Sequence, residues 1–529
     1  MATFLSHMKL QKAELKLWFY AFVAMCAVFS PLLFNFIWGN HDWQPLLVDS
    51  RVYSGLLEGR FSQYFLLCLT LMGKILPVLN ILLGFVLYSL ALVLLYSRFF
   101  EFPLKNTALL PIIAAAILPY INEILYFQFI VFSQLSWPLV IALALLCCKK
   151  AAKEYALLYE MSTYVLLLFA VSGYPAASNL FVSAVALDII IRSDSFKNMS
   201  KRLVLSVLPF LGAFLTLYVL HQWLISQHIM MSLYNNQTPG VVELIAKIFP
   251  MIVLSVQNLM QPQPFFSSGL KSAICLVLLL FVFYKLITEK TLKSRLFLIL
   301  CFAGLLLCLK FSAWLTFETP ENYFSQYDPA AFMVRTDFYA IPCLVLVCVA
   351  GLMNADGKLY KNAAVLMSVV LIVLSLKADF YFAKVHLFGF QTEALLQERI
   401  NNRIQENEGY NPESLYTVVQ AGELPARARF YKKSPLEKYG YYTLQIPYTR
   451  HWIAFEYYNF YAPKNFVREG TSINPQEITP KMIDFLSYKI DVWPSENAVY
   501  VDDTYAIIAL TKNGKKMLTE QFRHVRDGF

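Results

Sequence analysis

Charged residues are scarce in this chain: only 15% of its 529 residues are Asp, Glu, Lys or Arg, whereas 58% are hydrophobic. A water-soluble enzyme needs a solvated surface, which this composition cannot supply. The seven histidines show no metal-ligand spacing, and the sequence has no glycine-rich phosphate loop. A nucleotide-binding or metal-dependent centre therefore has no support from the sequence.

The C-terminal region contains no cysteine. All nine cysteines lie in or beside apolar segments, and none follows residue 383. The C-terminal region is therefore not built on disulfides. A cleaved signal peptide is not expected either, because the first apolar run is too long and lacks a small-residue cleavage site. The net charge of +9 is interpreted as membrane topology rather than nucleic-acid binding.

Long apolar runs are what the chain does contain. About 20 helical residues cross a hydrocarbon core of roughly 30 Å, and runs near this length recur through the first three quarters of the sequence. They predict a polytopic α-helical membrane protein with about eleven transmembrane helices. The predicted spans are 15–38, 75–96, 107–121, 127–148, 159–172, 175–191, 203–224, 267–286, 296–314, 338–353 and 362–381.

Lysine and arginine occur in alternate loops between these spans, for example at Arg98, Lys149, Arg192 and Lys285. Because such loops stay in the cytoplasm, the N-terminus is predicted to be cytoplasmic. Everything after residue 383 is then predicted to face outward. The other segments predicted to face outward are the loops 40–62, 226–246 and 317–336.

Hydropathy falls after residue 383, where Glu, Asn, Tyr and Pro become frequent. Residues 391–407 are predicted to form an amphipathic helix, and short alternating runs follow it. The last two runs flank Asp502-Asp503 and predict a hairpin. We therefore expect a transmembrane domain in residues 1–383 and an outward α+β domain in residues 384–529.

The first outward loop has the densest charge at the predicted membrane surface. It contains Asn40-His41-Asp42-Trp43, followed by Asp49, Arg51 and Arg60. Ionisable groups beside the hydrocarbon are expensive to keep and usually mark a site or a pathway, so chemistry is expected here. The structural alternative is that Asp42 caps a helix and Asp49 pairs with Arg51.

Two outward segments have the character of interfacial helices. Residues 52–71 and 241–257 mix aromatic and aliphatic residues with charged ones over helix-length stretches. Both are predicted to lie in the plane of the membrane interface. Two such helices on one face can frame a groove that is open to lipid.

The order of spans, the Asn-His-Asp-Trp loop and Gly59-Arg60-Phe61 resemble the membrane glycosyltransferases of the GT-C class. More narrowly, several segments are similar to the serotype-converting O-antigen glucosyltransferase family. The first loop departs from that family, because His41 stands where the family often has a second acid before Asp42. The similar segments are Asn122-Glu123-Ile124-Leu125-Tyr126-Phe127, Ser172-Gly173-Tyr174-Pro175-Ala176-Ala177, Val334-Arg335-Thr336-Asp337-Phe338-Tyr339, and Trp493-Pro494 with Val499-Tyr500-Val501-Asp502-Asp503.

The resemblance implies an enzyme of the bacterial inner membrane with a periplasmic C-terminal domain. It would move a hexose, with glucose as the expected sugar, from undecaprenyl phosphate to a surface polysaccharide such as O-antigen. A carboxylate would deprotonate the acceptor hydroxyl, and Arg or Lys would stabilise the departing phosphate. Asp42 is the first candidate for the base and Asp49 the second. The expected phosphate-binding residues are Arg60, Arg335, Arg51 and Lys310, and the expected substrate contacts are His41, Trp43, Glu123 and Tyr174.

Structural alternatives remain for several of these side chains. Arg60 could pair with Glu58, Glu123 could lie in a wet turn, and snorkelling to the interface is the favoured interpretation of Lys310. No cofactor is predicted, and a divalent metal is left open. The expected partners are the lipid-linked sugar donor, the polysaccharide acceptor and membrane lipids, without nucleic acid.

Two other functions are weighed against this one. The same chemistry could act on another sugar or another acceptor, such as teichoic acid, lipid A or a protein. A lipid or polysaccharide transporter is the alternative from a different class, and it predicts internal repeats and polar residues near the middle of the membrane. No convincing repeat is found, and the charges are expected to cluster at the outward surface instead.

Overall fold

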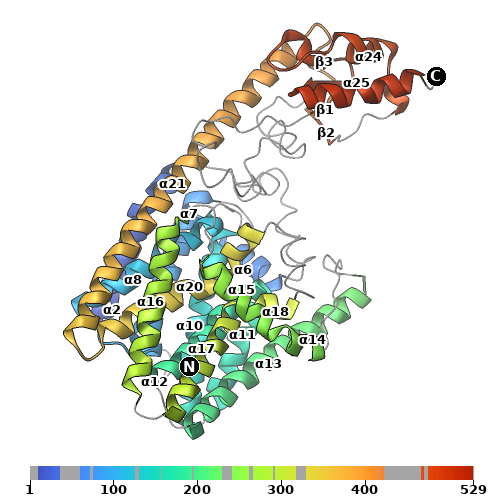
Figure 1. The fold of residues 1–529 in the computed structure, drawn as a ribbon. Helices are drawn as coiled ribbons and strands as arrows, with labels where there is room; N and C mark the ends of the chain where they lie inside the picture. Colours follow the sequence, from blue (N-terminus) through green and yellow to red (C-terminus); the bar gives the residue numbers. More distant parts are fainter. Residues whose placement is uncertain are drawn as a thin grey trace. The chain divides into compact units, whose positions relative to one another are not determined.

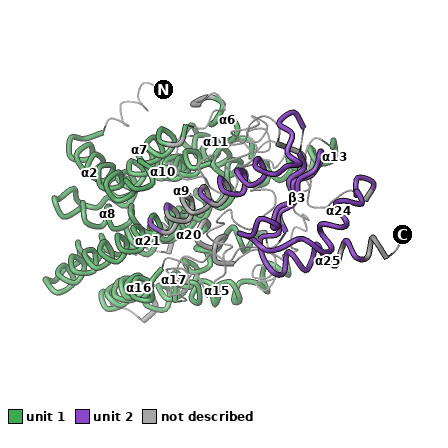
Figure 2. Tube along the Cα trace, turned by 90° about the horizontal axis from the view of Figure 1, so that it is seen from above, with its two compact units in different colours: residues 1–36, 50–383 green, residues 37–49, 384–529 purple. Residues whose placement is uncertain are grey.

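A computed structural model describes residues 10–35, 60–71, 76–125, 130–154, 157–192, 196–228, 241–260, 266–289, 292–316, 329–414, 416–421, 466–469 and 475–527. The chain forms two compact units (Figure 1). Among the described residues, unit 1 ends at Ala383 and unit 2 begins at Lys384, and Figure 2 colours the two units separately.

Unit 1 is a bundle of helices. In the described part of the chain, seven helices are long and apolar enough to cross a membrane, and four shorter apolar helices accompany them. This supports a helical membrane protein, while the total of about eleven spans stays a prediction. The helices are α2 Lys12–Val28, α3 Ser30–Phe34, α6 Phe61–Leu71, α7 Pro77–Leu94, η1 Leu95–Phe99, η2 Asn106–Ala108, α8 Leu109–Ala116, η3 Pro119–Ile121, α9 Asn122–Leu125, α10 Val131–Glu154, α11 Leu157–Gly173, η4 Pro175–Ala177, α12 Ser178–Arg192, α13 Phe196–Ser226, α14 Val241–Ala246, α15 Ile248–Met260, α16 Ser268–Thr288, α17 Leu292–Leu309, α18 Phe311–Thr316, α20 Pro329–Met353 and α21 Lys358–Gln405.

Burial separates central helices from peripheral ones. The apolar stretch of α20 is 94% buried, and this helix packs against α8, α12 and α16. The apolar stretch of α13 is only 22% buried, and it exposes Leu208, Leu215 and Trp223. Apolar exposure on this scale is unfavourable in water and is expected for a helix that faces lipid. The polar residues of α20 are therefore held inside the protein rather than against the bilayer.

Several predicted segments are divided in the structure: 15–38 between α2 and α3, 296–314 between α17 and α18, and 241–257 between α14 and α15. The expected span 107–121 is divided into η2, α8 and η3. An eight-residue helix such as α8 is about 12 Å long, which is too short to cross a bilayer. The helix ends before Pro119, because a proline disfavours helical backbone in the residue before it. The expected continuous helix over 107–121 is therefore divided, and its described α-helical part is shorter than a full span.

The expected last span, 362–381, and the expected amphipathic helix, 391–407, form one continuous helix of 48 residues, α21. No proline interrupts this sequence, and a single glycine, Gly389, costs only about 1 kcal/mol in a helix. Hydropathy therefore changes within one helix instead of at a break. Ile400 and Ile404 are buried as the amphipathic pattern predicts, whereas Leu395 is exposed.

Unit 2 contains a four-stranded sheet with the strand order β2-β1-β4-β3. Strand β1 runs parallel to β2 and β4, whereas β3 and β4 are antiparallel with Val499 opposite Ile508. This confirms the predicted hairpin, whose turn is held by Asp502 Oδ1 accepting from the backbone N–H groups of Thr504 and Tyr505. The elements are β1 Tyr416–Ala421, β2 Phe466–Glu469, η6 Pro475–Glu477, α24 Pro480–Asp484, η7 Phe485–Lys489, η8 Glu496–Ala498, β3 Val499–Val501, β4 Tyr505–Ala509 and α25 Lys512–Asp527.

The sheet of unit 2 has a hydrophobic cluster on each face. Leu518 and Phe522 of α25 pack with Ile507 in one cluster. Ile400 and Ile404 of α21 pack with Ile508 in the other. Alternate residues of β4 thus face opposite layers, which is the period expected of a strand that is buried on both sides.

Candidate functional site

The first polar group of unit 1 is centred on Asp337, near the N-terminal end of the buried part of α20. The Lys310 ammonium forms an ion pair with one oxygen of the Asp337 carboxylate, and the Asn258 side-chain amide donates to the other. The side chains of Lys310 and Asp337 are each 1% exposed. Removing two charges from water is costly, and good geometry with extra hydrogen bonds offsets that cost only in part.

A second lysine joins this group from α16. Lys271 Nζ donates to Tyr120 Oη and to the backbone carbonyl of Asn258, both at 3.0 Å. The ring centroids of Phe266 and Tyr120 lie 4.9 and 5.2 Å from Nζ, within range of cation–π attraction. We call Tyr120, Asn258, Lys271, Lys310 and Asp337 the Asp337 cluster. The Asp337 carboxylate joins α20 to α15 and to Lys310, and Lys271 attaches α16 through the backbone carbonyl of Asn258.

The second polar group surrounds the turn between α11 and α12. Tyr174 leaves the helix in an extended conformation and is followed by Pro175, which starts η4. Gly173 is required here, because a Cβ atom at this position would lie 2.2 Å from Cζ2 of Trp137. The predicted break at Gly173-Tyr174-Pro175 is thus confirmed, and close packing against α10 explains why residue 173 is a glycine.

The Tyr174 ring has a cation on one side and an aromatic ring on another. The Arg60 guanidinium carbon is 5.8 Å from the Tyr174 ring centroid. The Tyr174 and Tyr339 rings are also 5.8 Å apart, and the Tyr339 hydroxyl donates to Gln134 Oε1. We call Gln134, Gly173, Tyr174 and Tyr339 the Tyr174 turn. The expected phosphate-binding Arg60 and the expected substrate contact Tyr174 are therefore brought together.

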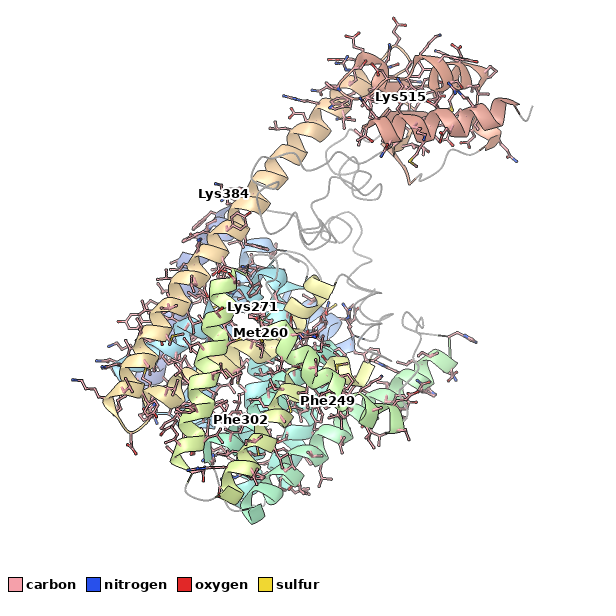
Figure 3. The ribbon with its side chains drawn as sticks, viewed as in Figure 1. Phe249, Met260, Lys271, Phe302, Lys384 and Lys515 are labelled. Carbon is pink, nitrogen blue, oxygen red and sulfur yellow. The ribbon has the colours of Figure 1, made fainter. Side chains whose placement is uncertain are left out.

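Both groups lie at the same end of the bundle. Asp337 and Tyr339 are two residues apart on α20, so they project to different sides of the helix. Asp337 faces Asn258 and Lys310, whereas Tyr339 faces Gln134 and Tyr174. In Figure 3, Lys271 and Met260 lie toward the upper end of unit 1, and Phe302 lies toward the lower end. This upper end is called the site end below.

The opposite end of the bundle holds a different set of charges, which we call the cation end. Lys149 Nζ donates to the backbone carbonyls of Arg98 and Phe99 at 2.7 and 2.6 Å. Arg192 pairs with Asp188 at 2.7 Å and with Glu101 at 3.0 Å. Lys285 donates to the carbonyl of Ile191 at 2.9 Å. The basic loops that were assigned to one side of the membrane therefore meet at one end.

The distance between the two ends sets the depth of the site. Helices α10, α12 and α16 each carry a site-end residue and a cation-end residue about 14 positions apart, which corresponds to about 20 Å along a helix. The pairs are Gln134 with Lys149, Lys271 with Lys285, and Asn179 with Arg192. Asn179 belongs to the site end because its side-chain nitrogen donates to the backbone carbonyl of Thr336 on α20. A hydrocarbon core is about 30 Å thick, so with the cation end at one membrane surface, the Asp337 cluster lies below the other surface.

Several expected site residues lie outside the described part of the chain: His41, Asp42, Trp43, Asp49 and Arg51. Arg335 lies in α20, two residues before Asp337. Glu123 lies in α9, next to Asn122, whose side-chain nitrogen donates to Asp379 Oδ1 at 2.9 Å. Arg335 is therefore close in sequence to Asp337, and Glu123 is next to Asn122, which pairs with Asp379.

Lys310 requires a correction. The favoured interpretation was that its ammonium snorkels to the interface, but the side chain is buried and paired with Asp337. The reason is that Asp337 of α20 lies inside the bundle, where its carboxylate pairs with the Lys310 ammonium. Lys310 was also expected to bind phosphate, and that role stays a prediction.

Sequence reasoning missed most of the buried polar residues. Asp337, Lys271 and Asp379 are 2% exposed or less, and the last two lie inside predicted spans. These charges are buried inside the protein, and their place relative to the membrane surface stays a prediction. An ionisable residue within an apolar span was the signal that could have identified Lys271 and Asp379. No comparable signal exists for Gln134 or Tyr339, which look ordinary in an apolar sequence.

Among the described residues, no group of three or more His, Cys, Asp or Glu side chains could hold a metal ion. Comparison with known proteins adds no assignment: no family model and no curated protein matches the chain. The function is therefore argued from the geometry of the two polar groups and from the motifs of the sequence.

Proposed function

We propose that this protein is a membrane glycosyltransferase of the GT-C type. It transfers a hexose, with glucose as the first candidate, from undecaprenyl phosphate to a surface polysaccharide such as O-antigen. The observation that supports this most is the gathering of Arg60, Tyr174 and the Asp337 cluster at one end of unit 1. Arg and Lys beside aromatic rings, next to apolar surface, suit a phosphate that carries a prenyl chain and a sugar.

The residues divide the reaction between them. A carboxylate, Asp42 or else Asp49, accepts the proton of the acceptor hydroxyl as its oxygen attacks the anomeric carbon. The bond from the anomeric carbon to the phosphate oxygen breaks, and the lipid phosphate leaves with the electron pair. Arg60 stabilises that leaving phosphate, and its position in the chain supports the role because it directly follows the loop that carries both acids.

The apolar surface near the site suits a lipid substrate. Val242, Ile245 and Phe249 of α14 and α15 are 80%, 63% and 73% exposed. Figure 3 labels Phe249 on unit 1, lower in that view than Met260 and Lys271. Exposed apolar side chains on short helices are typical of segments in the membrane interface. In the proposed enzyme these helices and α6 admit the prenyl chain.

The proposed placement is the bacterial inner membrane, with the cation end in the cytoplasm and unit 2 in the periplasm. The basic residues Arg98, Lys149, Arg192 and Lys285 support the cytoplasmic assignment of their end. Unit 2 then lies on the side where the polysaccharide acceptor is found and helps to hold it.

The test uses inner-membrane vesicles that contain the full chain, radiolabelled undecaprenyl-phosphate-glucose and the polysaccharide acceptor. We expect the wild-type protein to move label to the acceptor. Asp42→Asn should lower the rate by about 10²–10⁴, the usual contribution of a general base. Asp491→Asn, an exposed carboxylate of unit 2, is the matched control and should keep full activity.

The outcomes separate the possible assignments. If Asp42→Asn is fully active and present in the membrane at the normal level, Asp49 becomes the candidate base. The activity of Asp49→Asn would then test that role. Failure of the wild-type protein to transfer label to any of the proposed acceptors, polysaccharide, teichoic acid, lipid A or protein, would contradict a glycosyltransferase.

Transport is a second candidate, because Lys271 and Asp379 are buried and lie within long apolar helices, where ionisable residues often mark a transport pathway. Proteoliposomes with labelled undecaprenyl-phosphate-glucose separate the two functions. A transporter would move the intact lipid between the two leaflets, whereas the proposed enzyme leaves it in its leaflet until an acceptor is added. Leaflet exchange without cleavage of the sugar–phosphate bond would favour transport.

A further inference from the structure

Three buried side chains around the Tyr174 turn have polar atoms without a hydrogen-bond partner among the residues that the structure describes. They are the amide nitrogen of Gln134, the indole nitrogen of Trp137 and the amide oxygen of Gln63. These side chains are 1%, 0% and 4% exposed. Buried polar groups are nearly always paired, so three unpaired ones around one turn need an explanation.

The contacts of these residues converge on the turn from three helices. Trp137 of α10 packs directly against Gly173. Gln134, one turn earlier on α10, reaches Tyr174 through the Tyr339 hydroxyl and ring. Gln63 of α6 follows Ser62, whose hydroxyl is hydrogen-bonded to that of Ser172. Trp137 and Gln134 are thus held beside Gly173 and Tyr174, and Gln63 adjoins the contact between Ser62 and Ser172.

The unpaired atoms include both kinds of hydrogen-bonding group. The amide nitrogen of Gln134 and the indole nitrogen of Trp137 donate, whereas the amide oxygen of Gln63 accepts. A ligand that satisfies all three must offer both acceptors and a donor. A phosphate supplies acceptors alone, whereas each hydroxyl group of a sugar supplies both functions. The Tyr174 ring adds an apolar face of the kind that packs against a pyranose.

We infer that the Tyr174 turn, with Gln63, Gln134 and Trp137, is the subsite that recognises the hydroxyl groups of the transferred hexose. This inference rests on the proposed function and names the part of the site that selects the sugar. Arg60, which lies over the Tyr174 ring, places the donor phosphate next to this subsite. The sugar and the phosphate are therefore recognised by different residues and can be separated by mutation.

The experiment compares two lipids that differ only in the sugar. Binding of undecaprenyl phosphate and of undecaprenyl-phosphate-glucose is measured with the full chain in nanodiscs. The ratio of the two dissociation constants, Kd for the phosphate over Kd for the glucosyl phosphate, reports sugar recognition. Trp137→Phe removes one donor with limited loss of volume, and Gln134→Met removes a donor together with the acceptor of the Tyr339 hydroxyl. Each should lower the ratio by about two- to tenfold, the effect of one lost hydrogen bond, with little change in Kd for undecaprenyl phosphate.

The matched control is Ser375→Ala on α21, which removes another buried hydroxyl that has no hydrogen-bond partner among the described residues. It should leave both dissociation constants unchanged. A second readout uses a donor with a single deoxy position. A variant that has lost the contact to that hydroxyl should bind the glucosyl and deoxyglucosyl lipids equally, whereas the wild-type protein should prefer the complete sugar.

The results that would overturn the subsite are distinct from those that would overturn the proposed function. Suppose that the ratio of dissociation constants is well above one in the wild-type protein and is unchanged in both variants. This result would overturn the assignment of the subsite and leave the proposed function intact. A change in thermal stability without a change in ratio would do the same, because it would indicate that the three atoms bind structural water. A wild-type ratio of one would contradict the proposed function, and the subsite with it.

Discussion

The cation end and the site end of unit 1 both pair Lys or Arg with carboxylates, but they differ in contact with water. At the cation end, the side chains of Lys149 and Glu101 are 15% and 47% exposed, whereas Lys310 and Asp337 at the site end are each 1% exposed. Exposed pairs contribute about 0–1 kcal/mol and are easily maintained. A buried pair offers little net stability over apolar residues, so its retention indicates a requirement for specificity or function.

The strongest test of this contrast is to break the buried pair. Asp337→Ala leaves the Lys310 ammonium without its carboxylate inside the bundle. The expected loss is about 3–5 kcal/mol in the free energy of unfolding, measured by thermal unfolding in detergent. Glu101→Ala at the cation end is the matched single variant and should cost about 1 kcal/mol or less. Equal losses at both ends would remove the contrast.

A double variant sharpens the same question. Lys310→Met with Asp337→Leu replaces the pair by apolar side chains of similar volume. Stability should return close to that of the wild-type protein, because neither member of the Lys310–Asp337 pair is left buried without its partner. If the pair is kept for function, the double variant should fold but transfer sugar poorly. A stable and fully active double variant would show that the pair has no functional role.

The second test concerns the packing that shapes the site end. Gly173→Ala adds a methyl group where the Trp137 ring already lies, at 2.2 Å. Overpacking of this kind should cost about 1–3 kcal/mol of unfolding free energy and displace the Tyr174 turn. Gly304→Ala is the control, because a Cβ atom there meets nothing within 4 Å. If Gly173→Ala matched this control in stability, the close approach would not be what fixes the turn.

These tests also mark how far the sequence could predict the molecule. Apolar periodicity identified most helices, and the hairpin around Asp502-Asp503 followed from alternation and turn residues, because both signals are local. The continuity of α21 was missed, since a fall in hydropathy was interpreted as a break although no proline interrupts the helix. Local composition reports the environment of a helix, and it does not report where the helix ends.

The candidate site was predicted less well for a physical reason. Arg60 and Tyr174 were selected individually, and the structure brings them within 5.8 Å. The pairing of Lys310 with Asp337 joins residues 27 positions apart, and that of Tyr339 with Gln134 joins residues 205 apart. No single-sequence pattern encodes such tertiary pairs. A charge inside a span can be flagged from sequence, but its partner is chosen by the packing of other helices.

The third test asks whether the two ends differ in donor binding. Arg60→Ala should raise the dissociation constant for undecaprenyl phosphate about tenfold, which corresponds to roughly 1.4 kcal/mol, because a charged hydrogen-bond donor is lost. Arg192→Ala removes a guanidinium from the cation end and should leave this constant unchanged. Both are measured in nanodiscs with the purified protein. An equal effect of the two variants would mean that net charge, rather than the site end, controls binding.

The smallest expected effect is the pH response of the cation end. Burial raises the pKa of Glu101, but hydrogen bonds and charges from Lys149 and Arg192 outweigh it and lower that pKa from 4.5 to about 2. Because the folded-state pKa is depressed, the ionised carboxylate stabilises the protein above pH 4.5, and this contribution disappears as the pH falls toward 2. The side chain is 47% exposed, so we expect about 0–1 kcal/mol after screening.

Glu101→Gln separates the effect of the Glu101 charge from the effect of the backbone conformation at this position. Glu101 has a φ of 59°, in the left-handed region, and glutamine keeps that strain while removing the charge. The melting temperature of the wild-type protein should therefore exceed that of Glu101→Gln at pH 7, and the gap should narrow at pH 3. Glu101→Gly removes the charge and tolerates the positive φ, so it should melt at or above Glu101→Gln at both pH values. A gap that stays constant with pH would mean that the Glu101 carboxylate does not hold the cation end together by its charge.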